Sequence, residues 1–317
     1  MVLLEVANLH TRFLTSKGSV KAVDGISFSL DRGEVLGIVG ESGAGKSVTG
    51  FSILGLIDPP GEIVEGEILF EGENLLNCGK NALREIRGNK IAAVFQDPQS
   101  VLDPIMTIGE QLIETLLAHQ PQKGRREAWE EATVMLTHVG LPNAEREMRR
   151  YPHQLSGGMK QRIVIAMGLL NNPLLLIADE PTTALDVTTQ AQILYLMQTL
   201  VTSQNKSLIF ISHDLSVISQ ISHKIAVMYA GRIVEYGDKS TILNDPKHPY
   251  TQGLMGCLPS ITQTLQLLKP IPGSMPSLTH LPRGCYFKAR CPLADKQCNT
   301  YPKERIVAGR RVSCHKV

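Results

Sequence analysis

The chain has 317 residues, of which 43% are hydrophobic and 20% are charged, and its formal net charge at pH 7 is +2. This composition is typical of a globular α/β protein with a sizeable core, and a charge so near zero gives no reason to expect a nucleic acid or an anionic membrane as partner. No apolar run reaches the length of a membrane span, and the first five residues lack the basic start of a signal peptide, so we expect a cytoplasmic protein.

Short strands and helices alternate in the first part of the chain. Strands are predicted over residues 3–9, 26–30, 67–71 and 91–95. A short charged helix is predicted over 81–87. A further apolar strand at 35–39 leads into a glycine-rich loop and then into residues 46–57, whose apolar side chains recur at helical spacing.

The middle of the chain is predicted to be helical. From Thr107 to about Arg150 apolar residues recur every three or four positions, which predicts a helical subdomain at about residues 107–170 within the α/β core. Beyond it the alternation returns, with a helix at 190–200 and strands at 174–178, 208–211 and 225–229. Because these strands are almost wholly apolar, we expect a mostly parallel sheet that is covered on both faces.

The character of the chain changes after Cys257. The prolines at positions 259, 270, 272, 276 and 282 interrupt any long regular element there, and four of the six cysteines fall within the last 33 residues. We therefore place a boundary near Leu258, with a large domain over 1–258 and a small C-terminal module over 259–317.

The glycine-rich loop fits the phosphate-binding pattern G-x-x-x-x-G-K-[ST]. Glycines let successive backbone N–H groups turn toward an anion, Lys46 suits the β- and γ-phosphates, and the Ser47 hydroxyl suits Mg²⁺. A glycine-rich turn could carry the same letters, but the strand before it and the helix after it favour an anion site. The candidate phosphate-binding residues are Gly40, Glu41, Ser42, Gly43, Ala44, Gly45, Lys46 and Ser47.

Two acids follow the apolar strand at 174–178. Asp179 stands where a carboxylate would meet Mg²⁺ at the edge of the sheet, and Glu180 is placed to act on the attacking water. Taken alone, such a pair more often caps a helix or lies on a surface loop. Together with the phosphate-binding loop, it indicates hydrolysis of a nucleotide.

A third motif identifies a family. Residues 155–162 read Leu-Ser-Gly-Gly-Met-Lys-Gln-Arg, and from these letters alone a plainly capped helix is the simpler interpretation. Lying between a phosphate-binding loop and an Asp-Glu strand, however, the octet resembles the signature of ATP-binding-cassette (ABC) ATPases. The resemblance covers about residues 1–257. It implies a P-loop NTPase fold with an antiparallel β subdomain and an inserted helical subdomain, and it implies ATP and Mg²⁺ as cofactors.

The resemblance assigns further residues. Gln96 resembles the glutamine that contacts Mg²⁺ and water, and His213 resembles the histidine that touches the γ-phosphate. Residues 184–186, Ala-Leu-Asp, look like the D-loop. Phe13 is the candidate aromatic for stacking on adenine, although a lone phenylalanine is as often part of a core.

The family also implies a head-to-tail dimer of cassettes. Each ATP would lie between the phosphate-binding loop of one cassette and the Ser-Gly-Gly helix of the other. Ser156 and Gly158 would then serve the partner's nucleotide, whereas Lys46 and Glu180 would serve the chain's own.

Three stretches point to a subfamily. Residues 96–104, 178–187 and 248–251 look like those of the ATPase subunits of oligopeptide/dipeptide importers, with Val101 and Asp103 departing from the usual pattern. The resemblance implies a second, different ATPase chain, two membrane permeases and an extracytoplasmic peptide-binding protein, with this chain at the cytoplasmic face of the membrane. Other cargo, such as nickel or an antimicrobial peptide, stays open, and a non-transport ABC ATPase is a further alternative.

The C-terminal cysteines form a candidate metal site. Cys285, Cys291, Cys298 and Cys314 are soft ligands, but they lack the tight pairs common in structural zinc sites. Spacing alone leaves an iron–sulfur cluster, a zinc ion and free thiols open. The resemblance to peptide-importer ATPases, whose tails are associated with a [4Fe–4S] cluster, favours iron.

Overall fold

The computed structural model describes residues 1–16, 18–183, 185–257 and 270–317, which belong to two compact units. The first unit joins residues 1–77 to residues 210–317, and the second holds residues 78–209. The division falls within strand β8 (Ser207–Ser212). The predicted boundary near Leu258 lies outside the described residues.

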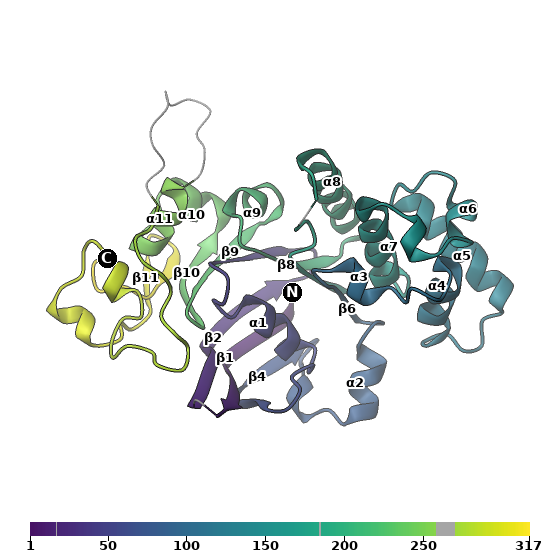
Figure 1. Ribbon diagram of the computed structural model, residues 1–317. Coiled ribbons are helices and arrows are strands. Elements are labelled where there is room, and N and C mark those ends of the chain that lie inside the picture. Colours follow the sequence, from purple (N-terminus) through teal and green to yellow (C-terminus); the bar gives the residue numbers. More distant parts are fainter. Residues whose placement is uncertain (17, 184, 258–269) are drawn as a thin grey trace. The chain divides into compact units, whose positions relative to one another are not determined.

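The first unit contains the N-terminal strands, the glycine-rich loop and the C-terminal segment. In Figure 1, α9, α10 and α11 lie on one side of β9 and β10. The elements of this unit are β1 (Val2–Thr15), β2 (Gly18–Asp31), β3 (Val35–Val39), α1 (Lys46–Ile53), β4 (Gly61–Phe70), β5 (Glu73–Asn74), η1 (Leu75–Asn77), α9 (Leu215–Ile221), β9 (Lys224–Tyr229), β10 (Arg232–Asp238), α10 (Lys239–Asn244), α11 (Pro249–Gly256), η3 (Lys288–Arg290), η4 (Lys296–Asn299), β11 (Arg305–Val307) and β12 (Arg310–Val312).

One sheet of the first unit is antiparallel, with strand order β2-β1-β4-β5. β1 and β2 pair from Val2 opposite Asp31 to Thr15 opposite Gly18, with several register shifts between. Both strands are much longer than predicted, because these bulges break the apolar alternation that a sequence pattern relies on.

The other strands of this unit lie in the order β11-β12-β10-β9-β3. β3 and β9 are parallel, with Val39 opposite Val227, and all five residues of β3 are buried. This continuous burial explains why β3 reads as an uninterrupted apolar run. β10 returns antiparallel to β9.

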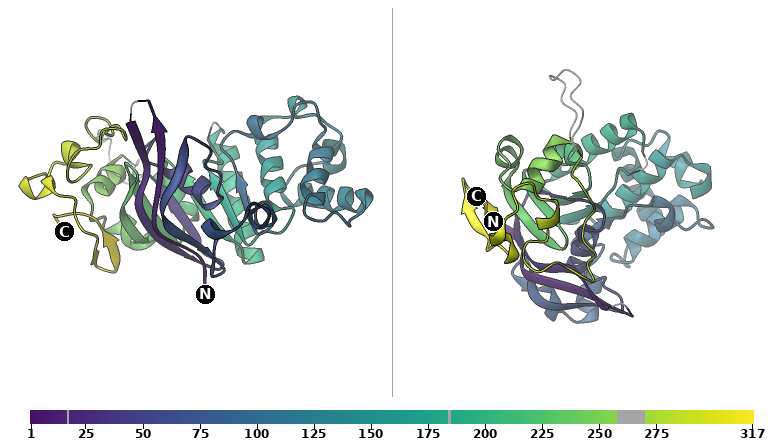
Figure 2. Two further views of the ribbon diagram at one scale, coloured as in Figure 1. Left: turned by 90° about the horizontal axis from the view of Figure 1, so that it is seen from below. Right: turned by 60° about the vertical axis from the view of Figure 1, so that its left-hand side comes forward.

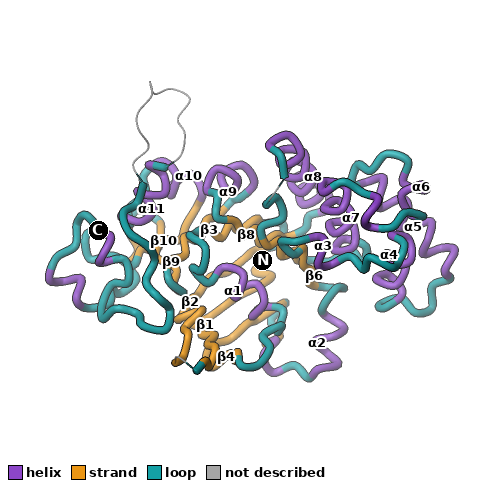
Figure 3. Tube along the Cα trace, viewed as in Figure 1, coloured by secondary structure: helices purple, strands orange, loops and turns teal. Residues whose placement is uncertain are grey.

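The C-terminal segment is joined to this sheet. β12 pairs antiparallel with β10, with Tyr236 opposite Arg311, and β11 pairs with β12. Figure 3 shows that most of the segment from residue 270 onward is loop, and Figure 2 shows it, in yellow, beside the green part of the first unit. Strands of three residues between prolines carry almost no periodic signal, so the sequence did not predict them.

The second unit is largely helical. Its elements are α2 (Lys80–Ile86), β6 (Ile91–Val94), α3 (Pro98–Val101), α4 (Ile108–Leu117), α5 (Arg125–His138), α6 (Ala144–Met148), η2 (Pro152–Gln154), α7 (Gly157–Leu169), β7 (Leu175–Asp179) and α8 (Val187–Gln204). The range predicted to be helical, residues 107–170, contains α4, α5, α6, η2 and α7, and α4 starts at a capping box in which Thr107 and Glu110 exchange hydrogen bonds. β6 and β7 pair in parallel, with Val94 opposite Ala178.

Within the parts of the chain that the structure describes, no helix combines the length and the apolar character that crossing a membrane requires.

Candidate nucleotide-binding site

The predicted phosphate-binding loop connects β3 to α1 in the first unit, and two of its glycines are enforced by backbone contacts. A Cβ at Gly40 would lie 2.2 Å from the Met228 carbonyl oxygen, and one at Gly45 would lie 2.2 Å from the Ala22 carbonyl oxygen. Gly45 also has a φ of +100°, which a side chain would strain. These contacts hold the loop tightly against β9 and β2.

Lys46 is the first residue of α1 and is buried inside this loop, with 4% of its surface exposed. Its ammonium donates to the carbonyl oxygens of Gly40, at 2.9 Å, and Glu41, at 3.1 Å. A buried cation at the start of a helix creates a strongly positive point, which suits a bound anion. Ser47 follows on α1.

Glu41, the second residue of the loop, is held from the C-terminal part of the chain. Its backbone N–H donates to the Tyr250 hydroxyl at 2.9 Å, and its carboxylate accepts from Arg290 Nη1 at 2.9 and 3.0 Å. From the sequence, Glu41 is only one member of the loop. No local pattern links residue 41 to residue 290, so neither contact could be predicted.

An aromatic cluster supports these contacts. Phe287 packs against Tyr229 at 5.2 Å and Tyr250 at 5.4 Å between ring centroids, and His248 lies beside it at 5.8 Å. Burial lowers the pKa of His248 to about 3, so the ring is neutral and its Nδ1 accepts the backbone N–H of Tyr250. Burial likewise raises the pKa of Tyr250 and keeps its hydroxyl protonated.

The predicted catalytic acids belong to the second unit. Asp179 ends β7 and is 7% exposed, and Glu180 follows with a φ of 46°, which is rare for a residue with a side chain. Gln96 Nε2 donates to Glu180 Oε2 at 3.2 Å, and the Thr183 hydroxyl donates to the same oxygen at 3.0 Å. The structure therefore brings together Gln96 and Glu180, which are 84 residues apart, and it adds Thr183.

The signature motif opens α7 in the second unit. Ser156 is exposed and caps the helix by accepting the backbone N–H of Met159 at 3.4 Å. A Cβ at Gly158 would lie 2.8 Å from Thr189 Cγ2, so the glycine lets the start of α7 approach α8. The Ser156 hydroxyl therefore lies at the surface, at the start of α7.

The remaining predicted residues have varied surroundings. His213 is exposed between β8 and α9. Asp186 caps α8 by accepting the Thr189 N–H at 2.9 Å, whereas Ala184 of the same predicted loop lies outside the described residues. Phe13 is half-buried on β1, with its ring over Gly61 of β4, where a Cβ would lie 2.5 Å from Cε1.

The predicted [4Fe–4S] cluster is wrong. Among the described residues, which include all four C-terminal cysteines, no three His, Cys, Asp or Glu side chains are grouped so that they could hold a metal ion. The zinc alternative has no site for the same reason. Metal ligation requires thiolates, but burial raises the pKa of Cys285 to about 11 and also raises the pKa of Cys291 and Cys314. The Cys298 thiol donates to Asp295 Oδ1 at 3.7 Å.

Contacts with the rest of the first unit, and not a metal, hold the C-terminal segment in position. Phe287 is 3% exposed within the aromatic cluster, and Arg310 is 3% exposed beneath β10. The Tyr286 hydroxyl donates to Asp24 at 2.8 Å, and Arg311 donates to the Ser27 carbonyl oxygen. The C-terminal segment, which has little core of its own, is thus stabilised by packing against the rest of the first unit.

Comparison with known proteins agrees with these motifs. The sequence model of the family described as "ABC transporter" matches residues 23–183, just over half of the chain. The model described as "Oligopeptide/dipeptide transporter, C-terminal region" matches residues 234–298.

Curated relatives match almost the whole chain. The dipeptide transport ATP-binding protein DppD of Lactococcus lactis is 50% identical over 90% of this chain and 82% of its own length. The oligopeptide transport ATP-binding protein OppD of Haemophilus influenzae is 49% identical over 95% of this chain and 93% of its own length.

Solved structures show the same fold. An ATP-binding cassette in a dimeric post-hydrolysis state bound to ADP and Pi has a TM-score of 0.67 at 28% identity, over 74% of this chain and 98% of that one. The predicted α/β cassette fold and the predicted family are therefore confirmed. The chain belongs to the ABC transporter family of ATPases, in the group that includes these oligopeptide and dipeptide transport ATP-binding proteins.

Proposed function

We propose that this ATPase drives the import of dipeptides or oligopeptides through a membrane transporter. The support is the match of residues 234–298 to the oligopeptide/dipeptide transporter C-terminal family, together with relatives near 50% identity that are named for peptide transport. The cassette would comprise residues 1–258, and residues 259–317 would form the C-terminal module of this type of transporter.

The geometry of the phosphate-binding loop fits a nucleotide. Gly40 and Gly45 let the loop lie against the backbone of β9 and β2, and Lys46 places a buried cation at the start of α1. Residues Gly40 to Ser47 would therefore hold the phosphates of ATP through their backbone N–H groups and the ammonium. Phe13 is our candidate for contact with adenine.

Oxygen ligands for Mg²⁺ would come from Ser47, Gln96 and Asp179, and such ligands are what this hard cation prefers. When bound, Mg²⁺ neutralises the charge that gathers on the phosphate oxygens. Glu180 would orient the attacking water and accept its proton, and His213 would contact the γ-phosphate. The main support for this assignment is the hydrogen bond from Gln96 to Glu180, because it holds in place the carboxylate that would accept the proton of the water.

A partner cassette would complete the site. Ser156 is exposed at the start of α7, where its hydroxyl and the N-terminus of the helix could meet a nucleotide held by another chain. Gly158 would approach the same nucleotide. We expect the partner to be a different ATPase chain, both to dock on two permeases at the cytoplasmic face of the membrane, and an extracytoplasmic binding protein to deliver the peptide.

Replacement of Glu180 by Gln tests the hydrolytic assignment. It preserves the size and hydrogen bonding of the side chain while removing the base, so steady-state ATPase activity of the assembled transporter should fall by about a thousandfold. Affinity for ATP should stay unchanged. Peptide-dependent stimulation of the wild-type ATPase in vesicles tests the cargo. Near wild-type turnover in Glu180→Gln would contradict the role of Glu180, and stimulation by nickel instead of peptide would contradict the substrate.

A further inference from the structure

Three parts of the chain beyond residue 240 converge on the phosphate-binding loop. Tyr250 bonds the backbone of Glu41, Arg290 bonds its carboxylate, and the Met275 methyl group lies 3.1 Å from where a Cβ of Gly43 would be. All of these residues belong to the first unit. The C-terminal segment is therefore part of the surroundings of the loop.

The ion pair between Arg290 and Glu41 is the strongest of these contacts. Arg290 is 6% exposed at its side chain, and its Nη1 reaches both carboxylate oxygens and, at 3.3 Å, the Tyr229 hydroxyl. Its Nε donates to the Pro272 carbonyl oxygen at 2.8 Å. A guanidinium with so many fixed partners is rigidly placed, so it fixes Glu41 in turn.

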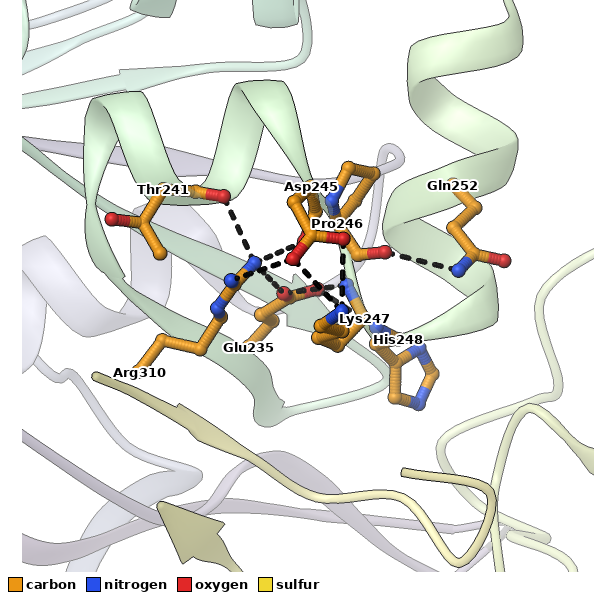
Figure 4. Close-up of polar contacts among 8 residues, drawn as sticks. All are labelled: Glu235, Thr241, Asp245, Pro246, Lys247, His248, Gln252 and Arg310. Carbon is orange, nitrogen blue, oxygen red and sulfur yellow. Dashed lines mark hydrogen bonds and ion pairs between the residues drawn. The ribbon is translucent and has the colours of Figure 1, made fainter. Parts of the chain in front are cut away.

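The second contact is supported by a buried ionic network, which Figure 4 shows. Glu235 is fully buried and accepts the backbone N–H groups of Lys247 at 2.9 Å and His248 at 3.0 Å. Arg310 of β12 lies 3.7 Å from Glu235 and also donates to the carbonyl oxygens of Thr241 and Asp245. The network thus sets the turn that begins α11, and with it the position of Tyr250.

We propose that the C-terminal segment positions the phosphate-binding loop through Glu41, and that Arg290 is a positioning residue for ATP binding. The triphosphate of ATP is strongly anionic, and a carboxylate on the loop would repel it. Arg290 neutralises this carboxylate and turns it away from the phosphates. The inference rests on the proposed role of the loop in holding ATP.

The test measures the ATP affinity of the full-length chain by equilibrium titration. Arg290→Met should weaken ATP binding by about tenfold, within the range that coupled sites commonly show. Arg290→Met combined with Glu41→Gln should regain most of this loss, because the uncompensated charge is gone. A purely structural role for Arg290 gives no such rescue. If Arg290→Met does not fold, Arg290→Gln keeps hydrogen-bond donors and replaces it in the same comparison.

Arg311→Met is the matched control. Arg311 is another arginine of the C-terminal segment, but it donates to the Ser27 carbonyl oxygen and lies 4.3 Å from the centroid of the Tyr236 ring, and neither residue belongs to the loop. Its replacement should leave ATP affinity within about twofold. Unchanged affinity in Arg290→Met, or a double variant as weak as Arg290→Met alone, would overturn the inference. Failure of Lys46→Ala to weaken ATP binding would instead overturn the role of the loop itself.

Discussion

The two halves of the candidate site are built in different ways. The phosphate-binding loop in the first unit is held by distant parts of the chain: Met228 and Ala22 against its glycines, and Tyr250 and Arg290 on Glu41. In the second unit, the Glu180 carboxylate accepts hydrogen bonds from two side chains of its own unit, Gln96 and Thr183, the second only three residues away.

This difference separates binding from hydrolysis. A loop fixed by many contacts presents preformed donors, which lowers the entropy lost when an anion binds. Glu180 has a strained backbone, with a φ of 46°, and its carboxylate accepts hydrogen bonds from the side chains of Gln96 and Thr183. Strain of this kind costs about 1–3 kcal/mol and is typical of residues that serve a reaction. Substitutions in the two halves should therefore change different quantities.

The largest effect should come from removing the buried cation of the loop. Lys46→Ala should weaken ATP binding by about a hundredfold, because hydrogen bonds to charged groups are worth about 1.5–3 kcal/mol each. Titration of the isolated chain with ATP measures it. The Gln96–Glu180 pair, which lies in the other unit, should be unaffected. Wild-type affinity in Lys46→Ala would place the nucleotide elsewhere.

A smaller effect, on turnover, should follow from removing the hydrogen bond that Gln96 donates to Glu180. Gln96→Ala removes the hydrogen bond at 3.2 Å and should lower turnover of the assembled transporter by about tenfold while ATP affinity stays within about twofold. Measuring both turnover and ATP affinity in this one variant shows whether the second unit's half of the site affects hydrolysis without affecting binding. A matching fall in affinity would show that Gln96 serves binding as well.

The sequence predicted the parts of the site that depend on local chemistry. The phosphate-binding loop, the acids after β7 and the capped start of α7 each combine a motif with a flanking element, and such patterns are readable within about ten residues. The contact of Arg290 with Glu41 spans 249 positions and has no local signal.

The iron–sulfur prediction was wrong for a related reason. That prediction rests on four soft ligands in a proline-rich segment and on the resemblance to peptide-importer ATPases, and neither indicates which distant residues the segment contacts. The order comes instead from residues far away in the sequence, through Arg290, Arg310 and Phe287. Similarly, β11 and β12 are strands only because β10 is there to pair with them.

The last effect concerns acid, which should lower the stability of the first unit. His248 caps α11 as a neutral acceptor, and burial lowers its pKa to about 3 from an ordinary value near 6.5. Below pH 6.5 the unfolded chain binds a proton that the folded chain does not. Stability should therefore be highest above pH 6.5 and fall as the pH drops toward 3, by up to about 1.4 kcal/mol per pH unit from this residue.

His248→Asn tests this effect, because asparagine keeps an acceptor at the cap and does not titrate. Urea unfolding at pH 7 and pH 4.5 gives the acid-induced loss of stability for each chain. The loss should be smaller in the variant, and the difference between the two losses isolates His248 from the carboxylates, which titrate in both chains. Equal losses would mean that His248 does not stay neutral in the folded chain. Since His248 supports Tyr250, Tyr250 bonds the loop at Glu41, and the folded chain keeps His248 neutral, ATP affinity of the folded wild-type chain should change over this interval in the same way as that of the variant.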